Sequence, residues 1–406
     1  MEKRTGLPVV AMVGGGQLAR MTHQAAIALG QSLRVLALGP DEPAALVSPD
    51  VVLGDHRDLD ALRRVAAGAE ALTFDHEHVP SEHLEVLVAE GVAVHPGPDA
   101  LRHAQDKLVM RRRLAELGVP VPPFAPVADV ADVEAFATEH GWPVVLKAVR
   151  GGYDGRGVWM LDSPEEAAAT VPELLEAGTP LMVEQKVVLR RELAVLLARS
   201  PYGQAAVYPT VETVQVDGIC TEVLAPAPGL SDDAGEAAEE LAIRIAAALG
   251  VVGLLAVELF ETPEGRVLVN ELAMRPHNSG HWSMDGAVTG QFEQHLRAVL
   301  DYPLGSTSTL RPACVMANVL GAGGERSDGE SGAAPVPATG PDERLHHTLA
   351  RFPEARVHLY GKAERPGRKI GHVNITGDDM DDVRRRARLA ADHLATGVWT
   401  DGWSAH

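Results

Sequence analysis

The sequence predicts a mixed α/β and α+β protein that begins with a doubly wound parallel sheet and ends with a small strand-rich domain. Short apolar runs typical of buried strands alternate with helical patterns up to about residue 98, which is the order of a parallel sheet with crossover helices. Beyond that point, strands and helices occur in mixed order to about residue 305. A chain of 406 residues has room for two or three domains with sizeable cores.

The N-terminal pattern starts with an apolar strand, a glycine loop and a helix. The strand is expected at residues 9–13 and the helix at residues 18–29, before Gly30. Further elements of this pattern are strands at residues 33–38, 51–53, 71–74 and 92–94 and a helix at residues 59–67.

The rest of the chain starts with one long predicted helix at residues 100–117, ended by Gly118 and the prolines after it. Residues 321–343 are rich in glycine, alanine, serine and proline and are expected to form a flexible surface connection. The other predicted elements are strands at residues 144–149, 158–161, 181–184, 192–198, 253–260 and 266–272 and helices at residues 234–249 and 380–395.

The composition disfavours several function classes. A formal net charge of −20 opposes binding to nucleic acid or anionic membranes, and no segment approaches the ~20 apolar residues of a membrane span. Cys220 and Cys314 are far apart in the sequence, so we expect buried or idle thiols rather than a disulfide or a zinc site. We therefore expect a soluble, cytoplasmic protein without nucleic-acid or membrane partners.

Lysine is rare in this chain, with six lysines among 36 basic residues. Arginine and lysine differ in geometry and hydration, so a lysine here is expected to mark a place that needs a compact ammonium charge. The six lysines are residues 3, 107, 147, 186, 362 and 369.

The first glycine loop, residues 14–19, matches the pattern G-x-G-x-x-A between a strand and a helix. Such a loop suits a dinucleotide pyrophosphate at a helix N-terminus, and an acidic residue, Asp41, follows beyond a Gly-Pro turn. Two other interpretations are a tight turn that only needs glycine and a site for some other phosphorylated ligand.

A second glycine-rich loop follows the strand that carries Lys147. Residues 150–157 contain four glycines together with Arg150 and Arg156. Backbone N–H groups of such a loop can cover phosphates, while the lysine contacts them as a point charge. A hairpin turn would explain the glycines but neither Lys147 nor Arg156, so phosphate binding is the favoured interpretation.

Two glutamates, Glu258 and Glu271, flank a hairpin whose turn is expected at residues 264–265. With a two-residue turn, they would lie directly opposite each other on adjacent strands. Such carboxylates repel each other unless a cation lies between them, and hard oxygen ligands beside a triphosphate suit magnesium. The alternative, two unrelated acids on an exposed hairpin, is disfavoured by the apolar neighbours.

The run that follows, residues 270–282, carries many hydrogen-bonding side chains without hydrophobic periodicity. This pattern is typical of a loop that lines a site rather than of a packing element.

Three runs resemble one enzyme family: Gly-Gly-Gly-Gln-Leu-Ala-Arg-Met at 14–21, Thr-Phe-Asp-His-Glu-His-Val at 73–79 and Asn-Glu-Leu-Ala-Met-Arg-Pro-His-Asn-Ser-Gly-His-Trp at 270–282. The chain resembles the N5-carboxyaminoimidazole ribonucleotide synthetases from its first strand to about residue 372. Its His-Asn-Ser-Gly-His-Trp run separates this family from the related formate-using glycinamide ribonucleotide transformylases, which have His-Asp-Thr-Gly there.

The resemblance implies an ATP-grasp fold with an N-terminal Rossmann-like domain at 1–98, an ATP-grasp domain at 99–305 with a small lid subdomain at about 125–190, and a C-terminal domain at 306–406. It implies a ligase of purine biosynthesis that joins bicarbonate to the exocyclic amine of 5-aminoimidazole ribonucleotide through carboxyphosphate, giving ADP and phosphate. ATP and Mg²⁺, or Mn²⁺, are the implied cofactors. A homodimer and functional coupling to a separate mutase are further expectations from the family.

The same resemblance assigns roles to individual residues. The implied metal ligands are Glu258 and Glu271. The implied ATP-binding residues are Lys107, Lys147, Gly152, Gly155, Glu184, Lys186, Val187, Glu192 and Asn270, with Glu184, Lys186 and Val187 at the adenine and Glu192 at the ribose. Bicarbonate or carboxyphosphate would meet Arg275, His277 and Asn278. Because water would destroy carboxyphosphate, residues 153–157, with Tyr153, Asp154 and Arg156, are expected to close over the phosphates as a lid. The aminoimidazole ribonucleotide would face Gln17, Leu18 and Glu77, and its phosphate would meet Lys362, Arg368 and Lys369.

Three rival functions stay open at this point. Another ATP-grasp ligase, such as the formate-dependent transformylase, would share the ATP and metal residues. An NAD-dependent dehydrogenase would use the first glycine loop but leaves Lys147, Glu258 and Glu271 unexplained. A non-catalytic nucleotide-binding module would be expected to lack one of the two metal carboxylates.

Overall fold

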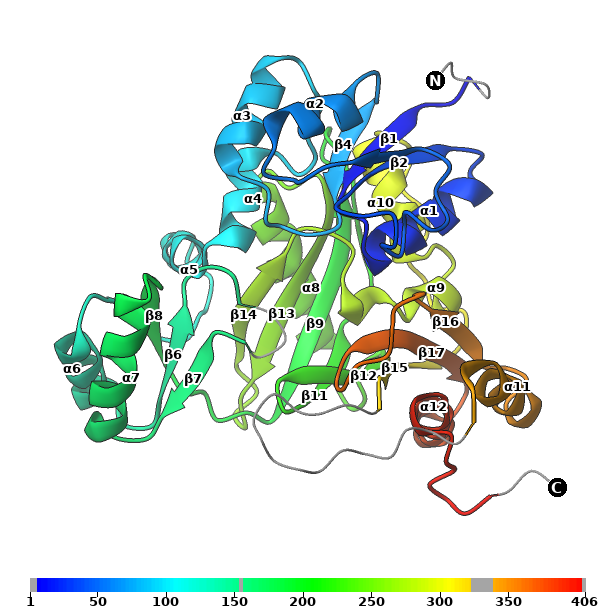
Figure 1. The fold of residues 1–406 in the computed structure, drawn as a ribbon. Helices are drawn as coiled ribbons and strands as arrows, with labels where there is room; N and C mark the ends of the chain where they lie inside the picture. Colours follow the sequence, from blue (N-terminus) through cyan, green and yellow to red (C-terminus); the bar gives the residue numbers. More distant parts are fainter. Residues whose placement is uncertain (1–5, 153–155, 323–338, 404–406) are drawn as a thin grey trace.

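The computed structural model describes residues 6–152, 156–322 and 339–403. Its N-terminal part is a four-stranded parallel sheet in the order β3-β2-β1-β4 with helices packed around it (Figure 1). This confirms the doubly wound parallel sheet predicted from the alternating pattern. The elements are β1 (Val9–Val13), α1 (Gln17–Ala28), β2 (Ser32–Ala37), β3 (Val51–Leu53), α2 (Leu59–Ala66), β4 (Ala71–Phe74) and α3 (Ser81–Ala89).

The prediction of one strand in this part of the chain is wrong. Residues 92–94 were expected to form a strand, but only Val94 pairs, in an isolated parallel bridge with Leu72. The apolar run is shorter than the usual strand of 5–6 residues, and His95 joins Pro96, which has no N–H to continue a ladder.

The long helix predicted at residues 100–117 is two helices, α4 (Pro98–Gln105) and α5 (Lys107–Glu116). Asp106 separates them because its backbone is extended, with φ −133° and ψ 107°. Its carboxylate accepts the N–H of Val109 at 2.9 Å and caps the second helix. The helical periodicity continues through Asp106, so the break was not predicted, although aspartate is a preferred N-cap residue.

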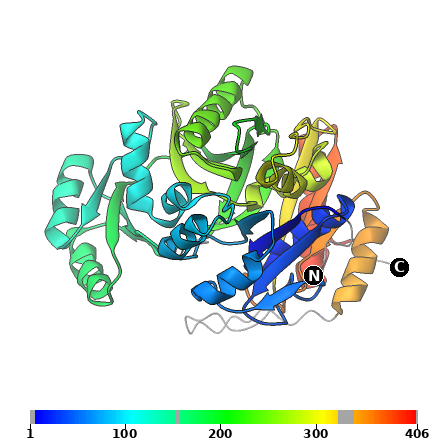
Figure 2. The same ribbon diagram turned by 90° about the horizontal axis from the view of Figure 1, so that it is seen from above.

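A small antiparallel sheet in the order β5-β8-β6-β7 carries two helices and has its own apolar core. It lies at one side of the molecule, and α5 leads into it from the N-terminal part (Figure 1). The view from above shows the same separation (Figure 2). Its elements are β5 (Phe124–Val127), α6 (Val130–His140), β6 (Val144–Ala148), β7 (Val158–Leu161), α7 (Pro164–Glu176) and β8 (Leu181–Gln185).

The largest sheet has nine strands and contains strands from both the middle and the end of the chain. Along it the order is β14-β13-β9-β11-β12-β15-β17-β16, and β10 pairs with β9. The antiparallel pairing of β12 with β15 joins the two regions into one continuous sheet. The strands are β9 (Arg191–Arg199), β10 (Ala205–Val207), β11 (Val211–Val216), β12 (Ile219–Ala225), β13 (Gly253–Glu261), β14 (Val267–Ala273), β15 (Ala313–Leu320), β16 (Arg356–Leu359) and β17 (Lys369–Gly377).

The helices of these regions cover the sheet and complete the core. Residues of α8, β9 and β13 share an apolar cluster with the N-terminal sheet and with α4 and α5, so α5 is anchored on the large sheet. None of the described helices is long and apolar enough to cross a bilayer. The helices are α8 (Asp232–Ala248), the 3₁₀ turn η1 (Asn278–Gly280), α9 (Ser283–Gly286), α10 (Gln291–Val299), α11 (Pro341–Arg351) and α12 (Met380–Thr396).

The predicted flexible segment, residues 321–343, extends too far at its C-terminal end. Residues 323–338 lie outside the described residues. Residues 341–343 already belong to α11, which begins with Pro341. Proline favours the first turn of a helix because its missing N–H is not needed there, so a proline-rich composition did not mean an irregular backbone.

Candidate active site

Glu258 on β13 and Glu271 on β14 lie opposite each other in the hairpin register. The turn between the strands is longer than predicted, because the last pair before it is Glu261 with Val267. A register shift next to Glu258 makes Asn270 an extra residue of β14, a β-bulge. The bulge corrects the register, so the predicted pairing of the two glutamates is confirmed although the predicted two-residue turn is wrong.

The pKa values of the two carboxylates are shifted in opposite directions. Burial and the repulsion of Glu271 raise the pKa of Glu258 to about 7. Burial would also raise the pKa of Glu271, but Lys107, whose ammonium contacts the Glu271 carboxylate, holds that pKa below its usual value. Two facing carboxylates repel each other, and a cation bound between them would remove the repulsion that favours the proton on Glu258.

The donor set fits magnesium. Carboxylate oxygens are hard ligands of the kind Mg²⁺ prefers, and Mg²⁺ usually takes one or two carboxylates together with substrate phosphates. Within residues 6–152, 156–322 and 339–403, no group of three or more acidic, histidine or cysteine side chains could hold a metal alone. Phosphate or water oxygens would therefore have to complete the coordination of Glu258 and Glu271.

His277 lies beside this pair, with its Nε2 3.2 Å from Oε1 of Glu258. Burial lowers the pKa of His277 well below its usual value, so the ring is neutral at physiological pH. Its Nδ1 accepts the N–H of Ser279 at 3.3 Å, which leaves the proton on Nε2 and lets it point at Glu258. The polar run predicted to line a site thus reaches the facing pair of carboxylates through His277.

Lys147 on β6 and Glu184 on β8 form a buried ion pair, with 2.6 Å between Nζ and Oε2. Arg111 of α5 binds the other oxygen of Glu184 at 2.5 Å. Lys147 also donates to Oδ1 of Asn270, the bulge residue, at 3.3 Å. Burial alone would raise the pKa of Glu184, but Lys147 and Arg111 hold it below its usual value.

The glycine-rich loop after Lys147 is described only in part, since Tyr153, Asp154 and Gly155 lie outside the described residues. A Cβ on Gly152 would lie 2.7 Å from the carbonyl oxygen of Arg156, so the two ends of the loop approach too closely for a larger residue. The backbone N–H of Lys107 donates to the carbonyl of Val149 at 2.9 Å and ties the start of α5 to the start of the loop.

The remaining predicted ATP residues follow β8. Lys186 is exposed, whereas Val187 and Glu192 are half-buried. Burial raises the pKa of Glu192, near the start of β9, and Lys147 partly offsets this rise. The carboxylate of Glu184, one of the residues expected at the adenine, is engaged by Lys147 and Arg111.

Residues from three distant parts of the chain meet at the other end of the site. Glu77 accepts the backbone N–H of Met274 at 2.9 Å and binds Nε of Arg275 at 3.0 Å. The ammonium of Lys362 contacts the side-chain oxygen of Gln17. Of the other expected residues, Leu18 is buried, Asn278 starts η1, and Arg368 and Lys369 are half-buried at the start of β17.

Family models match three successive stretches of the chain. Residues 7–105 match the ribonucleotide synthetase preATP-grasp domain, residues 112–292 the ATP-grasp domain, and residues 314–386 the phosphoribosylaminoimidazole carboxylase C-terminal domain. The N5-carboxyaminoimidazole ribonucleotide synthase of Mycobacterium tuberculosis is 62% identical over 399 residues, which cover 98% of this chain and 90% of that protein. The chain belongs to the N5-carboxyaminoimidazole ribonucleotide synthase family.

Solved structures of this synthase family have the same fold. The N5-carboxyaminoimidazole ribonucleotide synthetase of Thermus thermophilus is 36% identical, with a TM-score of 0.82 over 97% of this chain and 100% of that one. The Aspergillus clavatus synthase in complex with ADP and 5-aminoimidazole ribonucleotide is 32% identical, with a TM-score of 0.83 over 95% and 98%. The ATP-grasp fold and the ligase class inferred from the motifs are thereby confirmed.

In this family member the first glycine loop is not arranged for a dinucleotide. The N–H of Gly16 is bonded to Asp75, and a Cβ on Gly15 would collide with the carboxylate of Glu42. Burial raises the pKa of Asp75 to about 6. Two carboxylates at a small hollow of about 150 Å³ would repel a pyrophosphate, which removes the support for the NAD interpretation.

The sequence analysis missed a cluster of histidines that His281, at the end of the polar run, forms with residues near the C-terminus. His281 and His372 have ring centroids 4.9 Å apart, and His372 stacks on His358 at 4.5 Å. Tyr360 is hydrogen-bonded to Nδ1 of His372 at 2.7 Å, and Asp285 of α9 binds Nε2 of His358 at 2.7 Å. The cluster joins α9 to β16 and β17, and its members could only be found once these elements were placed together.

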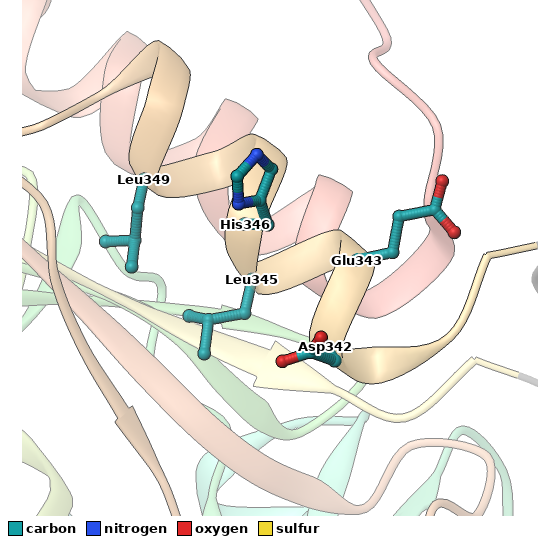
Figure 3. Close-up of a pocket in the computed structure, with 5 residues that line it drawn as sticks. All are labelled: Asp342, Glu343, Leu345, His346 and Leu349. Carbon is teal, nitrogen blue, oxygen red and sulfur yellow. The ribbon is translucent and has the colours of Figure 1, made fainter.

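A second hollow, of about 390 Å³, lies on the surface along α11 (Figure 3). Its lining comes from that single helix and includes none of the predicted site residues. The lining residues are Asp342, Glu343, Leu345, His346 and Leu349. It is therefore a surface depression and not part of the active site.

Proposed function

We propose that this chain carboxylates 5-aminoimidazole ribonucleotide with bicarbonate in purine biosynthesis and converts ATP to ADP and phosphate. The observation that carries the proposal is the pairing of Glu258 with Glu271, with Lys107 in contact with one carboxylate and His277 beside the other. With this arrangement, a metal and triphosphate site would lie directly beside the polar run that carries the resemblance to the synthase family.

For ATP, Lys107 and Lys147 would contact phosphates, and Glu258 and Glu271 would hold Mg²⁺ or Mn²⁺. The bound metal would neutralise charge on the phosphates during phosphoryl transfer. The described position of Glu184 supports an adenine contact through the backbone rather than through its carboxylate. The remaining residues proposed for ATP are Gly152, Gly155, Lys186, Val187, Glu192 and Asn270, with Tyr153, Asp154 and Arg156 in the closing loop.

For the other substrates, Arg275, His277 and Asn278 would hold bicarbonate and the carboxyphosphate formed from it. Glu77 binds both the backbone before Arg275 and its guanidinium, which supports a role in fixing that arginine. The aminoimidazole ribonucleotide would lie between Gln17 and Leu18 on one side and the loop of Lys362 on the other. Arg368 and Lys369 would complete the binding of its phosphate.

The chemistry needs positioning and charge neutralisation more than a covalent catalyst. A bicarbonate oxygen attacks the terminal phosphorus of ATP, the bond to the bridging oxygen of ADP breaks, and carboxyphosphate results. The amine of the ribonucleotide then bonds to the carboxyl carbon, or to carbon dioxide released from carboxyphosphate, phosphate leaves, and the amine loses a proton. A site rich in Lys, Arg and carboxylates without a nucleophilic Ser or Cys suits this sequence.

Several wider expectations go with this function. We propose domain boundaries at 1–98, 99–305 and 306–406, a lid subdomain at about 125–190, and a cytoplasmic location. We also propose a homodimer and functional coupling to a separate mutase.

Both free cysteines are buried, as expected for structural thiols. The formate-dependent transformylase is the rival that the experiment below distinguishes.

The test is the formation of ADP from Mg-ATP while each substrate is omitted in turn. We expect turnover only with both aminoimidazole ribonucleotide and bicarbonate, and we expect Glu271→Gln to abolish it because a metal carboxylate is lost. Glu264→Gln, a change at the exposed turn of the same hairpin, is the matched control. Turnover with formate and glycinamide ribonucleotide would refute the substrate assignment, and no ADP with any substrate set would refute the ligase.

A further inference from the structure

We infer that Arg111 is a positioning residue for the ATP site: it neutralises Glu184, so that the charge of Lys147 is left for the triphosphate. The inference rests on the proposed contact of Lys147 with ATP. Arg111 lies in α5, outside the motifs that the sequence analysis connected with ATP, and its side chain is 1% exposed.

The carboxylate of Glu184 is shared between two cations. Nε of Arg111 lies 2.5 Å from Oε1, and Nζ of Lys147 lies 2.6 Å from Oε2. Each cation therefore uses one oxygen, and the three side chains carry one net positive charge. That charge lies on the Lys147 side of the cluster, since Arg111 is nearly fully buried and Lys147 is the member expected to face ATP.

Without Arg111 the balance would change. Both oxygens of Glu184 would be open to Lys147, and an ammonium can approach a carboxylate from several directions because it is a compact charge with three donors. The pair would then be neutral overall. A neutral pair attracts a triphosphate much less than a net cation does, so Lys147 would bind ATP weakly although it is itself unchanged.

The helix that carries Arg111 also fixes the second lysine. Lys107 lies four residues earlier, on the same face of α5. Its N–H is bonded to Val149 at 2.9 Å, and Asp106 binds Nε of Arg150 at 2.9 Å. One helix thus holds Lys107 against Glu271 and Arg111 against Glu184, so the positions of both lysines depend on α5.

A purely structural role would give a different result. Buried ion pairs contribute little net stability in many proteins, but removal of one partner leaves an unpaired charge and destabilises the fold. A structural defect would lower the amount of folded enzyme and so reduce the rate with every substrate. The positioning role predicts a defect confined to the nucleotide.

The experiment measures the KM of Mg-ATP, aminoimidazole ribonucleotide and bicarbonate, and the Kd of ADP, for Arg111→Met. Since a hydrogen bond to a charged group contributes about 1.5–3 kcal/mol, we expect the KM of Mg-ATP and the Kd of ADP to rise about 10- to 100-fold. The other two KM values should stay within about 2-fold. Arg112→Met, at the exposed neighbouring position on α5, is the matched control and should behave as the wild type.

Two further variants separate charge from packing. Arg111→Lys restores a cation and should recover most of the nucleotide affinity. Arg111→Met/Glu184→Gln removes both the carboxylate and its partner, returns the cluster to one net positive charge on Lys147, and should bind ADP more tightly than Arg111→Met. The double variant leaves no unpaired buried carboxylate, so it keeps the test available if Arg111→Met does not fold.

Lys147→Met distinguishes the inference from the proposed function. If Lys147→Met raises the KM of Mg-ATP but Arg111→Met does not, or if the double variant is no better than Arg111→Met, the positioning role is overturned. If Lys147→Met leaves the KM of Mg-ATP unchanged, the proposed contact of Lys147 with ATP is wrong, and the inference falls with it.

Discussion

Two clusters of side chains differ in charge. The ion-pair cluster consists of Lys107, Arg111, Lys147, Glu184 and Glu271 and is charged. The histidine cluster consists of His281, His358, His372 and Tyr360 and includes rings that burial keeps neutral. Both lie in the interior and both join distant parts of the chain. In the first, each of the two carboxylates has a cation beside it. In the second, burial lowers the pKa of His281 to about 3, the histidine rings contact one another, and Tyr360 is hydrogen-bonded to His372.

The difference agrees with the proposed function. A triphosphate and a metal would bring large charges, so a cluster that binds them has to offer charges that are already fixed in place. The histidine cluster holds β16 and β17 against α9, where an unpaired charge would cost stability. The comparison predicts that lowering the pH destabilises the histidine cluster before the ion-pair cluster. Substitutions that remove a charge should have the larger effect in the ion-pair cluster.

The largest expected effect is acid destabilisation through the histidine cluster. Burial lowers the pKa of His281 from 6.5 to about 3, so its neutral form is favoured in the fold. This stabilisation is present above pH 6.5 and is lost as the pH falls toward 3, with a limit of about 5 kcal/mol for this shift. We expect the urea-measured unfolding free energy to fall between pH 7 and pH ~4.5, and less steeply in His281→Gln.

The control for this prediction is His346→Gln, at an exposed position on α11. It should follow the wild type at both pH values. Equal acid sensitivity in the wild type and in His281→Gln would show that His281 does not contribute to the pH dependence.

The next effect concerns Asp75, a buried carboxyl that directly follows β4 and accepts the N–H of Gly16. Burial raises the pKa of Asp75 from 3.8 to about 6, so the protonated form is favoured in the fold. The corresponding stability is present below pH 3.8 and is lost as the pH rises through about 6. Asp75→Asn should therefore be more stable than the wild type at pH ~7, by up to about 3 kcal/mol, and similar at pH ~4. Chemical denaturation at both pH values checks this, and a variant less stable at neutral pH would contradict it.

A smaller effect is expected at the pair of Glu77 and Arg275, where the two loops of the active site meet. Glu77→Gln keeps the shape but removes the charge that orients the guanidinium, so we expect kcat/KM for bicarbonate to fall about 100-fold, as for a catalytic group displaced by about 1 Å. Glu85→Gln, at a largely exposed position on α3, should change it little. Steady-state ADP formation measures both, and an unchanged Glu77→Gln would exclude the orienting role.

The smallest effect is expected at an exposed ion pair outside both clusters. Arg113 lies 3.1 Å from Glu116 on the surface of α5, with side chains 41% and 64% exposed. Arg113→Gln should lower the unfolding free energy by less than ~0.5 kcal/mol, because solvent screens such pairs. A thermal melt checks this, and a large loss of stability would mean that exposed pairs contribute as much as the buried clusters.

Local patterns predicted the elements that have a clear periodicity. β1, β3, β4 and β7 begin and end where the apolar runs do, and α12 differs from the predicted helix by one residue. The failures occurred where a local feature interrupts a pattern, as at Asp106 between α4 and α5 and at the bulge of Asn270. The bulge could not be predicted because a one-residue shift leaves the alternation of each strand intact.

For the candidate active site, the motifs located the residues that are proposed to carry chemistry but not their partners. Glu258, Glu271, Lys147 and the polar run after Glu271 were predicted as a phosphate and metal site, and the structure brings them together. Arg111 was missed because a lone arginine in a helix has no distinguishing pattern. Its partner Glu184 is 73 residues away, and only the packing of α5 on β8 pairs them.

The sequence by itself determined the family, the ligase chemistry and the periodic strands and helices, because these depend on residue type and short-range spacing. Only the tertiary structure decided which polar and charged groups pair with each other. Glu77 and Arg275 are 198 residues apart, and Gln17 and Lys362 are 345 residues apart. The pairing of such groups depends on how three sheets pack together. A glutamate that binds a metal, a substrate or a neighbouring cation is written the same way in the sequence, so the sequence alone does not tell these partners apart.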